Sequence, residues 1–224
     1  MRLEDLRKLN LDMLITLKGL VSLMRDPEQT NSVFDVEDGL RHTKAAQLAT
    51  DYAKSKPGVA DIFAERYLAP PPDVPSLLKL PDDSLGHAYA LYITEAGFDP
   101  NFYRKTEIED DVTYLFMRMR QTHDIWHVVT GFGVDVNAEL GLKAFEIAQV
   151  HRTLSAMLVA GGLLRTLFKT PENLDGLLEQ VAIGYRMGAR AKPFLAQKWE
   201  EHWEKPVAVW RRELNVEPAT TYIP

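Results

Sequence analysis

The sequence contains no cysteine, and this absence removes several kinds of chemistry. Without thiols the chain forms no disulfide, no thiolate zinc site and no cysteine nucleophile. Basic residues are also too few for a protein that binds nucleic acid, because 26 Lys and Arg are set against 32 Asp and Glu and the formal net charge is -6. Any metal site must therefore use nitrogen and oxygen ligands.

Long apolar runs are missing as well. The longest, at 154–164, is far shorter than the ~20 residues that a membrane-spanning helix requires. Residues 1–7 alternate charges with leucines, and this pattern differs from a secretory signal. We therefore expect no signal peptide and no transmembrane helix, while contact with a membrane surface stays open.

Helical periodicity extends through almost the whole chain, and we find no alternating strand pattern. One apolar stripe occupies 11–24, and a helix is expected over 36–54. A proline-rich stretch at 69–78 would then separate an N-terminal helical arm (1–68) from the main body (79–224). The sequence predicts a single all-α domain with a bundle-like core.

Capping signals predict where the helices of the main body begin and end. Ser84 is expected to cap the start of one helix, which should end at Gly97. Thr106 and Glu109 are expected to form the capping box of the next helix, about twenty residues long. Asn137 should cap the helix after that.

The segment 123–139 reads H-D-I-W-H-V-V-T-G-F-G-V-D-V-N-A-E and is the strongest functional signal in the chain. His123, Asp124 and His127 fall within about 100° of arc at the edge of the buried stripe of a helix. Imidazoles at positions i and i+4 can bind one ion. A chain reversal at the glycine-bearing loop would bring Glu139 to face His127. The pattern predicts a divalent metal site with two imidazoles, two carboxylates and water.

Two other enzyme classes use similar patterns. In the zincin motif H-E-x-x-H the glutamate is the general base, and Asp124 is one methylene shorter and would reach the water poorly. A phosphohydrolase of the H…H-D…D type would use His87, His123, Asp124 and Asp175. That assignment leaves Glu139 without a role. The zincin class is therefore less favoured because of Asp124, and the phosphohydrolase class because of Glu139.

At these residues the chain resembles the coenzyme Q (ubiquinone) biosynthesis protein 4 family, which carries H-D-x-x-H, eleven residues and then Glu. The resemblance extends over most of the chain, to Arg25-Asp26-Pro27, Leu80-Pro81-Asp82-Asp83-Ser84-Leu85-Gly86, Tyr89, Tyr114, Arg118, Arg120, Lys143, Glu146, Trp199, Glu200 and Arg211. The chain departs from the family pattern at Ile125-Trp126, where the aromatic residue is shifted, and it lacks a Pro-Trp element near 183–186. We therefore identify it as a divergent, bacterial member.

The resemblance implies a metal bound by His123, Asp124, His127 and Glu139, with zinc as the first choice and magnesium, manganese or iron as alternatives. It also implies that a polyprenyl lipid or prenylated quinone precursor binds at a membrane surface, together with other quinone-biosynthesis proteins. The reaction implied is oxidative removal of the ring carboxyl at C1. The alternative is a non-catalytic lipid-binding scaffold whose metal is structural.

Four further residues are expected to lie beside the bound prenyl lipid or quinone precursor. Arg118, Arg120 and Lys143 would bind a prenyl phosphate or a ring carboxylate, and Tyr114 would lie beside them. Arg120 lies one helical turn before Asp124 and is also expected to pair with it and orient it.

Two apolar segments allow two interpretations each. The segment 154–168 is either a buried core helix or the wall of a groove for a prenyl tail. The stripe of Leu195, Trp199, Trp203 and Trp210 is either core or a surface for a membrane or a partner helix. We expect a homodimer that is cytoplasmic in a bacterial cell and peripheral to the membrane.

Overall fold

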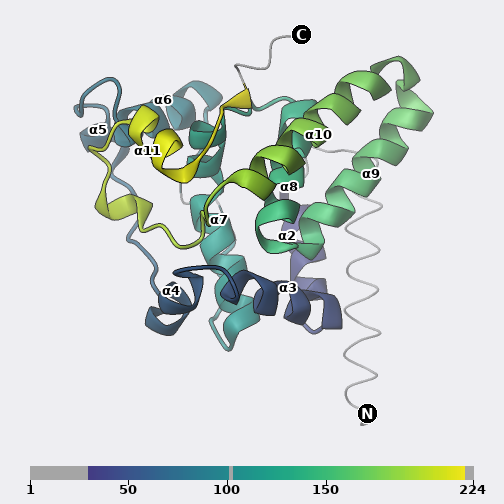
Figure 1. Ribbon diagram of the computed structural model, residues 1–224, viewed down its shortest axis with the longest axis horizontal. Coiled ribbons are helices and arrows are strands. Elements are labelled where there is room, and N and C mark those ends of the chain that lie inside the picture. Colours follow the sequence, from purple (N-terminus) through teal and green to yellow (C-terminus); the bar gives the residue numbers. More distant parts are fainter. Residues whose placement is uncertain (1–29, 101–102, 220–224) are drawn as a thin grey trace.

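Helices form almost all of the regular structure in the residues that this computed structural model describes, 30–100 and 103–219 (Figure 1). The α-helices are α2 (Thr30–Leu40), α3 (Lys44–Lys54), α4 (Val59–Glu65), α5 (Val74–Leu77), α6 (Leu85–Ala96), α7 (Asp111–Thr130), α8 (Val136–Val150), α9 (Thr153–Lys169), α10 (Leu174–Arg190) and α11 (Val207–Leu214). Two 3-10 turns, η1 (Pro171–Asn173) and η2 (Trp199–Glu201), complete the regular elements. These ranges contain no β-strand, so the all-α prediction is confirmed.

Helix α7 passes through the middle of the molecule and is buried on nearly every face (Figure 1). Its Trp126 makes edge-on contacts with the rings of Phe145 from α8 and Phe194. Phe194 in turn contacts Trp199, whose ring lies 4.6 Å from that of Trp210. The predicted tryptophan stripe therefore belongs to the core at Trp199 and Trp210, and α7 has a fixed position at the centre of an aromatic cluster.

Helices α8 and α10 pack backbone against backbone. A Cβ atom added at Gly184 of α10 would lie only 1.9 Å from the carbonyl oxygen of Gly141 in α8. One turn further along, Gly188 approaches Phe145 in the same way. Helix α9 joins this pair and, with α10, forms an antiparallel arm at the edge of the molecule (Figure 1).

The helix expected over 36–54 is two helices, and that prediction was wrong. Thr43 separates them: its hydroxyl donates to the carbonyl oxygen of Leu40 at the end of α2 and accepts from the backbone N–H of Ala46 in α3. A threonine that caps the second helix can therefore end one helical pattern without any glycine or proline.

The predicted boundaries held at α6 and the predicted length of about twenty residues held at α7, whereas the capping residues of α7 and α8 differ from the prediction. Ser84 caps the start of α6 and Gly97 ends it with φ 67°, as expected. The capping box of α7 is formed by Asp110 and Thr113 instead of Thr106 and Glu109. Helix α8 is capped by Asp135, not by Asn137, because the Asp135 carboxylate accepts from two backbone N–H groups of the first turn.

The N-terminal part of the chain packs on the main body where it is described. Helix α2 lies against α9, and α3 lies against α7, α8 and α9. Within the stretch 69–78 a short helix, α5, begins after Asp73. The stripe predicted at 11–24 lies outside the described residues, and the expected division into arm, linker and body stays a prediction.

The first part of the segment 154–168 agrees with the core interpretation, and a prenyl-tail groove along it stays a prediction. Leu154 and Val159 at the start and middle of α9 are buried, whereas Leu164, Leu167 and Phe168 near its end are 48%, 49% and 75% exposed. No helix among the described residues is long and apolar enough to cross a membrane. The C-terminal end of α9 is therefore an exposed apolar surface of the arm formed by α9 and α10.

The contact between α8 and α10 can be tested with a matched pair of glycine variants. Gly184→Ala should lower the free energy of unfolding by about 1–3 kcal/mol, because its methyl group meets backbone that cannot move aside. Gly161→Ala in α9 should instead raise it by about 0.5–1 kcal/mol, since a Cβ there meets nothing within 4 Å and alanine favours a helix. Urea unfolding measures both, and equal shifts would contradict the close approach.

Candidate metal centre

The end of α7 and the start of α8 bring the predicted metal ligands together. His123 and His127 lie one turn apart in the last part of α7, which ends at Gly131 with φ 75°. The chain then reverses, and Asp135 caps the start of α8. Glu139 is therefore in the first turn of α8, beside the two histidines, as the sequence predicts.

The three side chains converge on one point. Nε2 of His127 is 2.9 Å from Oε2 of Glu139, and Nε2 of His123 is 3.5 Å from Oε1 of the same carboxylate. The two Nε2 atoms are 3.3 Å apart. One ligand atom from each residue lies within 4.8 Å of the others, which is close enough for a single ion to contact all three.

The opposite nitrogen of each imidazole faces an acceptor. Nδ1–H of His127 donates to the carbonyl oxygen of Phe132 at 3.1 Å, and Nδ1 of His123 is 3.3 Å from a carboxylate oxygen of Glu146. Metal-binding histidines in proteins are usually held in this way, because a hydrogen bond at one nitrogen leaves the lone pair of the other free for the metal. The arrangement therefore fits the donor set of a divalent metal site.

Asp124 is not part of this group of three. Its charge acts on the tyrosines of α6: burial and the Asp124 carboxylate both raise the pKa of Tyr89 and of Tyr92 above the ordinary value. A metal-binding role for Asp124 stays a prediction. The other residues of the phosphohydrolase pattern are also elsewhere, since His87 faces the carbonyl oxygen of Leu78 and Asp175 lies in the first turn of α10.

Lys143 lies inside the cluster. Its Nζ is 3.0 Å from Oε1 of Glu139 and 3.1 Å from Oε1 of Glu146. Burial alone would lower the pKa of Lys143, but the two carboxylates outweigh burial and raise it. A charged ammonium group is therefore available next to the predicted metal position, where the sequence predicts ligand binding.

Burial alone would favour the neutral forms of His123 and Glu139, and the neighbouring charged groups outweigh burial. Burial and Lys143 lower the pKa of His123, but Glu139 and Glu146 raise it to about 9. Burial raises the pKa of Glu139, but Lys143 and the two histidines hold it well below its usual range. The metal-free cluster is thus a set of mutually stabilised charges.

Bonds to other protein groups occupy the three remaining residues that are expected to bind the substrate, Arg118, Arg120 and Tyr114. Arg118 donates to both carboxylate oxygens of Glu200, at 2.6 and 3.0 Å. The Tyr114 hydroxyl donates to backbone carbonyl oxygens of Ile62 and Tyr67. Their expected contact with the lipid stays a prediction, and these side chains would have to give up internal bonds to make it.

The expected pair between Arg120 and Asp124 is wrong. Arg120 is buried, and its guanidinium donates to Glu37 at 2.7 Å and to Asp38 at 2.8 Å, both in α2. The Thr106 hydroxyl accepts a further bond from it. Carboxylates from a distant helix thus replace the local partner, because they reach a guanidinium that is buried between α7 and α2.

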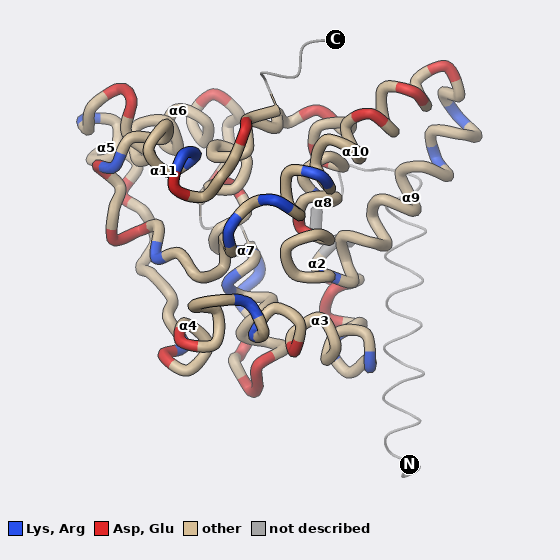
Figure 2. The backbone as a smooth tube through the Cα atoms, viewed as in Figure 1, with Lys and Arg blue, Asp and Glu red and all other residues tan. Residues whose placement is uncertain are grey.

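A buried group of ion pairs connects the metal ligands to α2, and sequence analysis missed most of it. Arg152 bonds to Glu146 on one side and to Glu37 on the other. Figure 2 shows the acidic positions of α2 in red and the basic positions of α7 in blue. Glu146 was detectable, since it lies two turns after Glu139 in the same helix and belongs to the resemblance. Glu37 has no local sequence signal.

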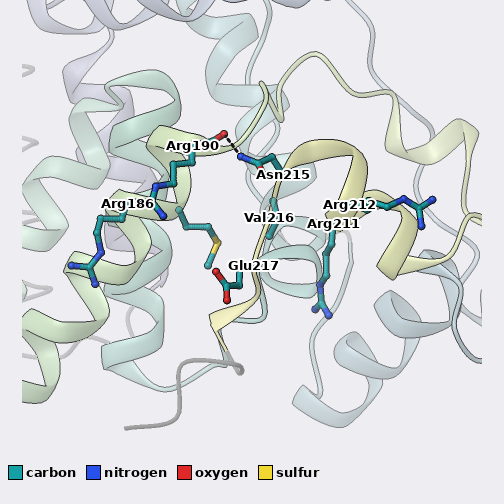
Figure 3. A pocket seen from close by; sticks show the side chains of 8 residues that line it. Arg186, Arg190, Arg211, Arg212, Asn215, Val216 and Glu217 are labelled. Atoms are coloured by element: carbon teal, nitrogen blue, oxygen red, sulfur yellow. Dashed lines mark hydrogen bonds between the residues drawn. The ribbon is translucent and has the colours of Figure 1, made fainter.

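A separate cavity of about 440 Å³ lies between α10 and the segment at the end of α11 (Figure 3). Four arginines line it: Arg186, Arg190, Arg211 and Arg212. The Arg211 guanidinium also donates to the carbonyl oxygens of Val128 and Val129, and burial lowers its pKa. Arg211 therefore caps the end of the helix that carries both histidines.

Three comparisons relate the chain to known proteins. The model of the family described as coenzyme Q (ubiquinone) biosynthesis protein Coq4 matches residues 4–220. The crystal structure of a Nostoc punctiforme protein, whose description names ubiquinone biosynthesis, superposes with a TM-score of 0.81. That protein is 38% identical, and the match covers 89% of this chain and 96% of the other.

Two fungal relatives give the same result at lower identity. The mitochondrial ubiquinone biosynthesis protein COQ4 of Podospora anserina is 33% identical over 147 residues, which are 65% of this chain and 48% of that protein. Its counterpart in Zygosaccharomyces rouxii is 30% identical over 149 residues, 65% of this chain and 44% of the relative. The chain thus spans about half the length of the curated relatives that it matches.

The pKa of His123 offers a direct test of the cluster. In protein treated with a chelator, its imidazole should titrate near pH 9 instead of 6.5 in an NMR titration. Because the folded-state pKa is the higher one, the interaction stabilises the fold fully below pH 6.5 and is lost as the pH rises through 9. Glu139→Gln should lower this pKa, whereas Glu213→Gln, which affects an exposed pair with Lys205, should leave it unchanged. A wild-type value near 6.5 would contradict the ion pairs.

Proposed function

This chain belongs to the coenzyme Q (ubiquinone) biosynthesis protein Coq4 family, and on this premise we propose that it binds a divalent metal at His123, His127 and Glu139 and acts there on a polyprenylated ring. The proposed reaction is oxidative decarboxylation at C1: the bond between the ring and its carboxyl breaks, CO2 leaves, and one oxygen atom of dioxygen becomes the new ring hydroxyl. The second oxygen atom leaves as water, with two electrons from an external reductant and two protons. Zinc is the first candidate for the metal, with magnesium, manganese and iron as alternatives.

The observation that carries the proposal is the orientation of the two imidazoles. Both Nε2 atoms face Glu139, while Nδ1 of His127 faces the carbonyl oxygen of Phe132 and Nδ1 of His123 lies 3.3 Å from Glu146 and 3.4 Å from Nζ of Lys143. The side chains of His123 and Glu139 are 25% and 35% exposed, so the group is only partly buried. A bound divalent metal supplies Lewis-acid stabilisation of ring oxygens. Asp124 is a further candidate ligand from the sequence motif.

Lys143 is the residue that would hold the ring carboxylate. Its charged Nζ lies 3.0 Å from Glu139 and can exchange this partner for a carboxylate of the substrate. The position next to the metal ligands would place the reacting carbon of the ring between Lys143 and the metal. We assign the ligand role to Lys143 ahead of Arg118 and Arg120, because Lys143 bonds to Glu139 itself, whereas the two guanidinium groups pair with Glu200 and Glu37.

A pocket of about 510 Å³, separated from His127 by two ring contacts, is the candidate site for an isoprenoid tail. Pro72, Pro75, Ile93 and Phe98 are among its lining residues. The ring of Phe98 contacts that of Tyr92, and Tyr92 stacks on His127 at 5.4 Å between ring centres. The rings of Phe98 and Tyr92 would therefore lie between a tail in this pocket and the imidazole of His127.

A non-catalytic scaffold is the second candidate, because Glu139 and Lys143 are already engaged in ion pairs that favour a structural site. The two functions differ in one measurement. Metal-loaded protein either releases CO2 from a carboxylated prenylphenol or binds it without change. Association with other quinone-biosynthesis proteins and formation of a homodimer are parts of both proposals.

We expect His127→Ala and Glu139→Gln to weaken Zn²⁺ binding by more than the 10–100-fold typical of residues that only support a ligand, because each removes a donor atom. Isothermal titration after chelator treatment measures the change. Asp124→Asn is the informative third variant: a loss as large as that of His127→Ala makes Asp124 a ligand, and a small loss limits the site to three protein ligands. Unchanged binding in Glu139→Gln would refute the site.

The exposed end of α9 supports contact with a membrane surface. Replacing Leu164, Leu167 and Phe168 together by glutamine should abolish flotation with vesicles of phosphatidylethanolamine and phosphatidylglycerol, because these side chains are the exposed apolar area of the arm. Leu48→Gln is the control, since Leu48 is 56% exposed on α3. Flotation of the triple variant at the wild-type level would exclude this face.

A further inference from the structure

The carboxylate of Glu146 lies behind His123, on the side away from the proposed metal. We propose that Glu146 is a positioning residue of the metal centre and that Arg152 and Glu37 hold it in place, so that α2 is part of the site. This inference rests on metal binding at His123, His127 and Glu139, which is the proposed function.

The contacts of Glu146 are the first step. It has no exposed surface. One carboxylate oxygen is 3.3 Å from Nδ1 of His123 and 3.1 Å from Nζ of Lys143. The other accepts from the Arg152 guanidinium at 2.9 Å and from the Ser155 hydroxyl. Each oxygen therefore has two partners, and the carboxylate cannot turn without breaking bonds on both sides.

The second step is the direction of the imidazole. His123 can present its Nε2 lone pair to a metal only if the proton is on Nδ1 and the ring points toward Glu139. The Glu146 oxygen is the acceptor that favours this tautomer and this ring orientation. His127 receives the same support from the carbonyl oxygen of Phe132, which is backbone. Only the support of His123 depends on a side chain.

The third step leads to α2. Arg152 lies immediately before α9 and donates to Oε1 of Glu37 at 2.6 and 3.0 Å. Oε2 of Glu37 accepts from Arg120 of α7 at 2.7 Å. Glu37 is fully buried, so it shares the charge of both guanidinium groups and has no water to replace them. Loss of Glu37 would leave Arg152 with Glu146 as its one carboxylate partner among the described residues.

A purely structural role is the competing explanation, since buried ion pairs also connect helices. Metal affinity and stability separate the two roles. Glu200 supplies the matched control because it too is a mostly buried carboxylate that binds an arginine of α7, Arg118, with both oxygens. Arg118 lies outside the group formed by His123, His127 and Glu139.

The test uses Co²⁺ as the probe, in chelator-treated full-length protein, with the visible absorption of bound Co²⁺ as the readout. Glu146→Gln should weaken Co²⁺ binding 10–100-fold and change the absorption spectrum, because His123 loses its orientation. Glu37→Gln should weaken binding in the same direction by a smaller factor. Glu200→Gln should lower the urea midpoint and leave the Co²⁺ affinity within about twofold of wild type.

The outcomes separate the inference from the proposed function. If Glu146→Gln lowers the urea midpoint but binds Co²⁺ with wild-type affinity and spectrum, the ion pairs are only structural and the inference is overturned. If wild-type protein binds no Co²⁺ and no Zn²⁺, the proposed function itself fails. Should Glu146→Gln not fold, Ser155→Ala removes one hydrogen bond to Glu146 and should weaken Co²⁺ binding several-fold. Unchanged binding in Ser155→Ala would then count against the inference.

Discussion

Arg152 bonds to two carboxylates, Glu37 and Glu146, that have no exposed surface. A buried carboxylate costs several kcal/mol unless cations and hydrogen bonds compensate for the water it loses. The fold meets this requirement by placing Arg152 between α2 and α8, at the start of α9. The three helices are therefore fixed relative to one another by the same ion pairs that lie behind His123.

This arrangement gives the metal centre an open side and a closed side. The open side carries the ligand atoms, where His123 and Glu139 are partly exposed. The closed side carries Glu146 and Lys143, which are buried. The ring of Tyr92 connects His127 with Phe98, which lines the pocket proposed above for a prenyl tail. Lys143 contacts both Glu139 and Glu146 and so connects the partly exposed groups with the buried ones.

The parts of the site that sequence analysis predicted are local, and the parts it missed are distant. His123, His127 and Glu139 follow from helical spacing and a short reversal, which a single sequence displays. Arg120 has an acid at i+4, yet its partner is Glu37, 83 residues away in the chain. No local pattern encodes such a pair, because it depends on how α2 packs. The break at Thr43 was missed for the opposite reason: its cap is local, but apolar periodicity hides it.

The charges of the cluster indicate what kind of ligand suits it. In the metal-free protein the carboxylates of Glu139, Glu146 and Glu37 are compensated by Lys143, by Arg152 and by a His123 whose pKa is about 9. Metal binding requires a neutral His123, so one proton leaves when a dication enters and the local charge rises by one. Among the described residues, Glu139 supplies the one carboxylate in the group with His123 and His127. If a metal binds there as proposed, an anionic ligand such as a ring carboxylate would compensate for this added charge, whereas a neutral phenol would not.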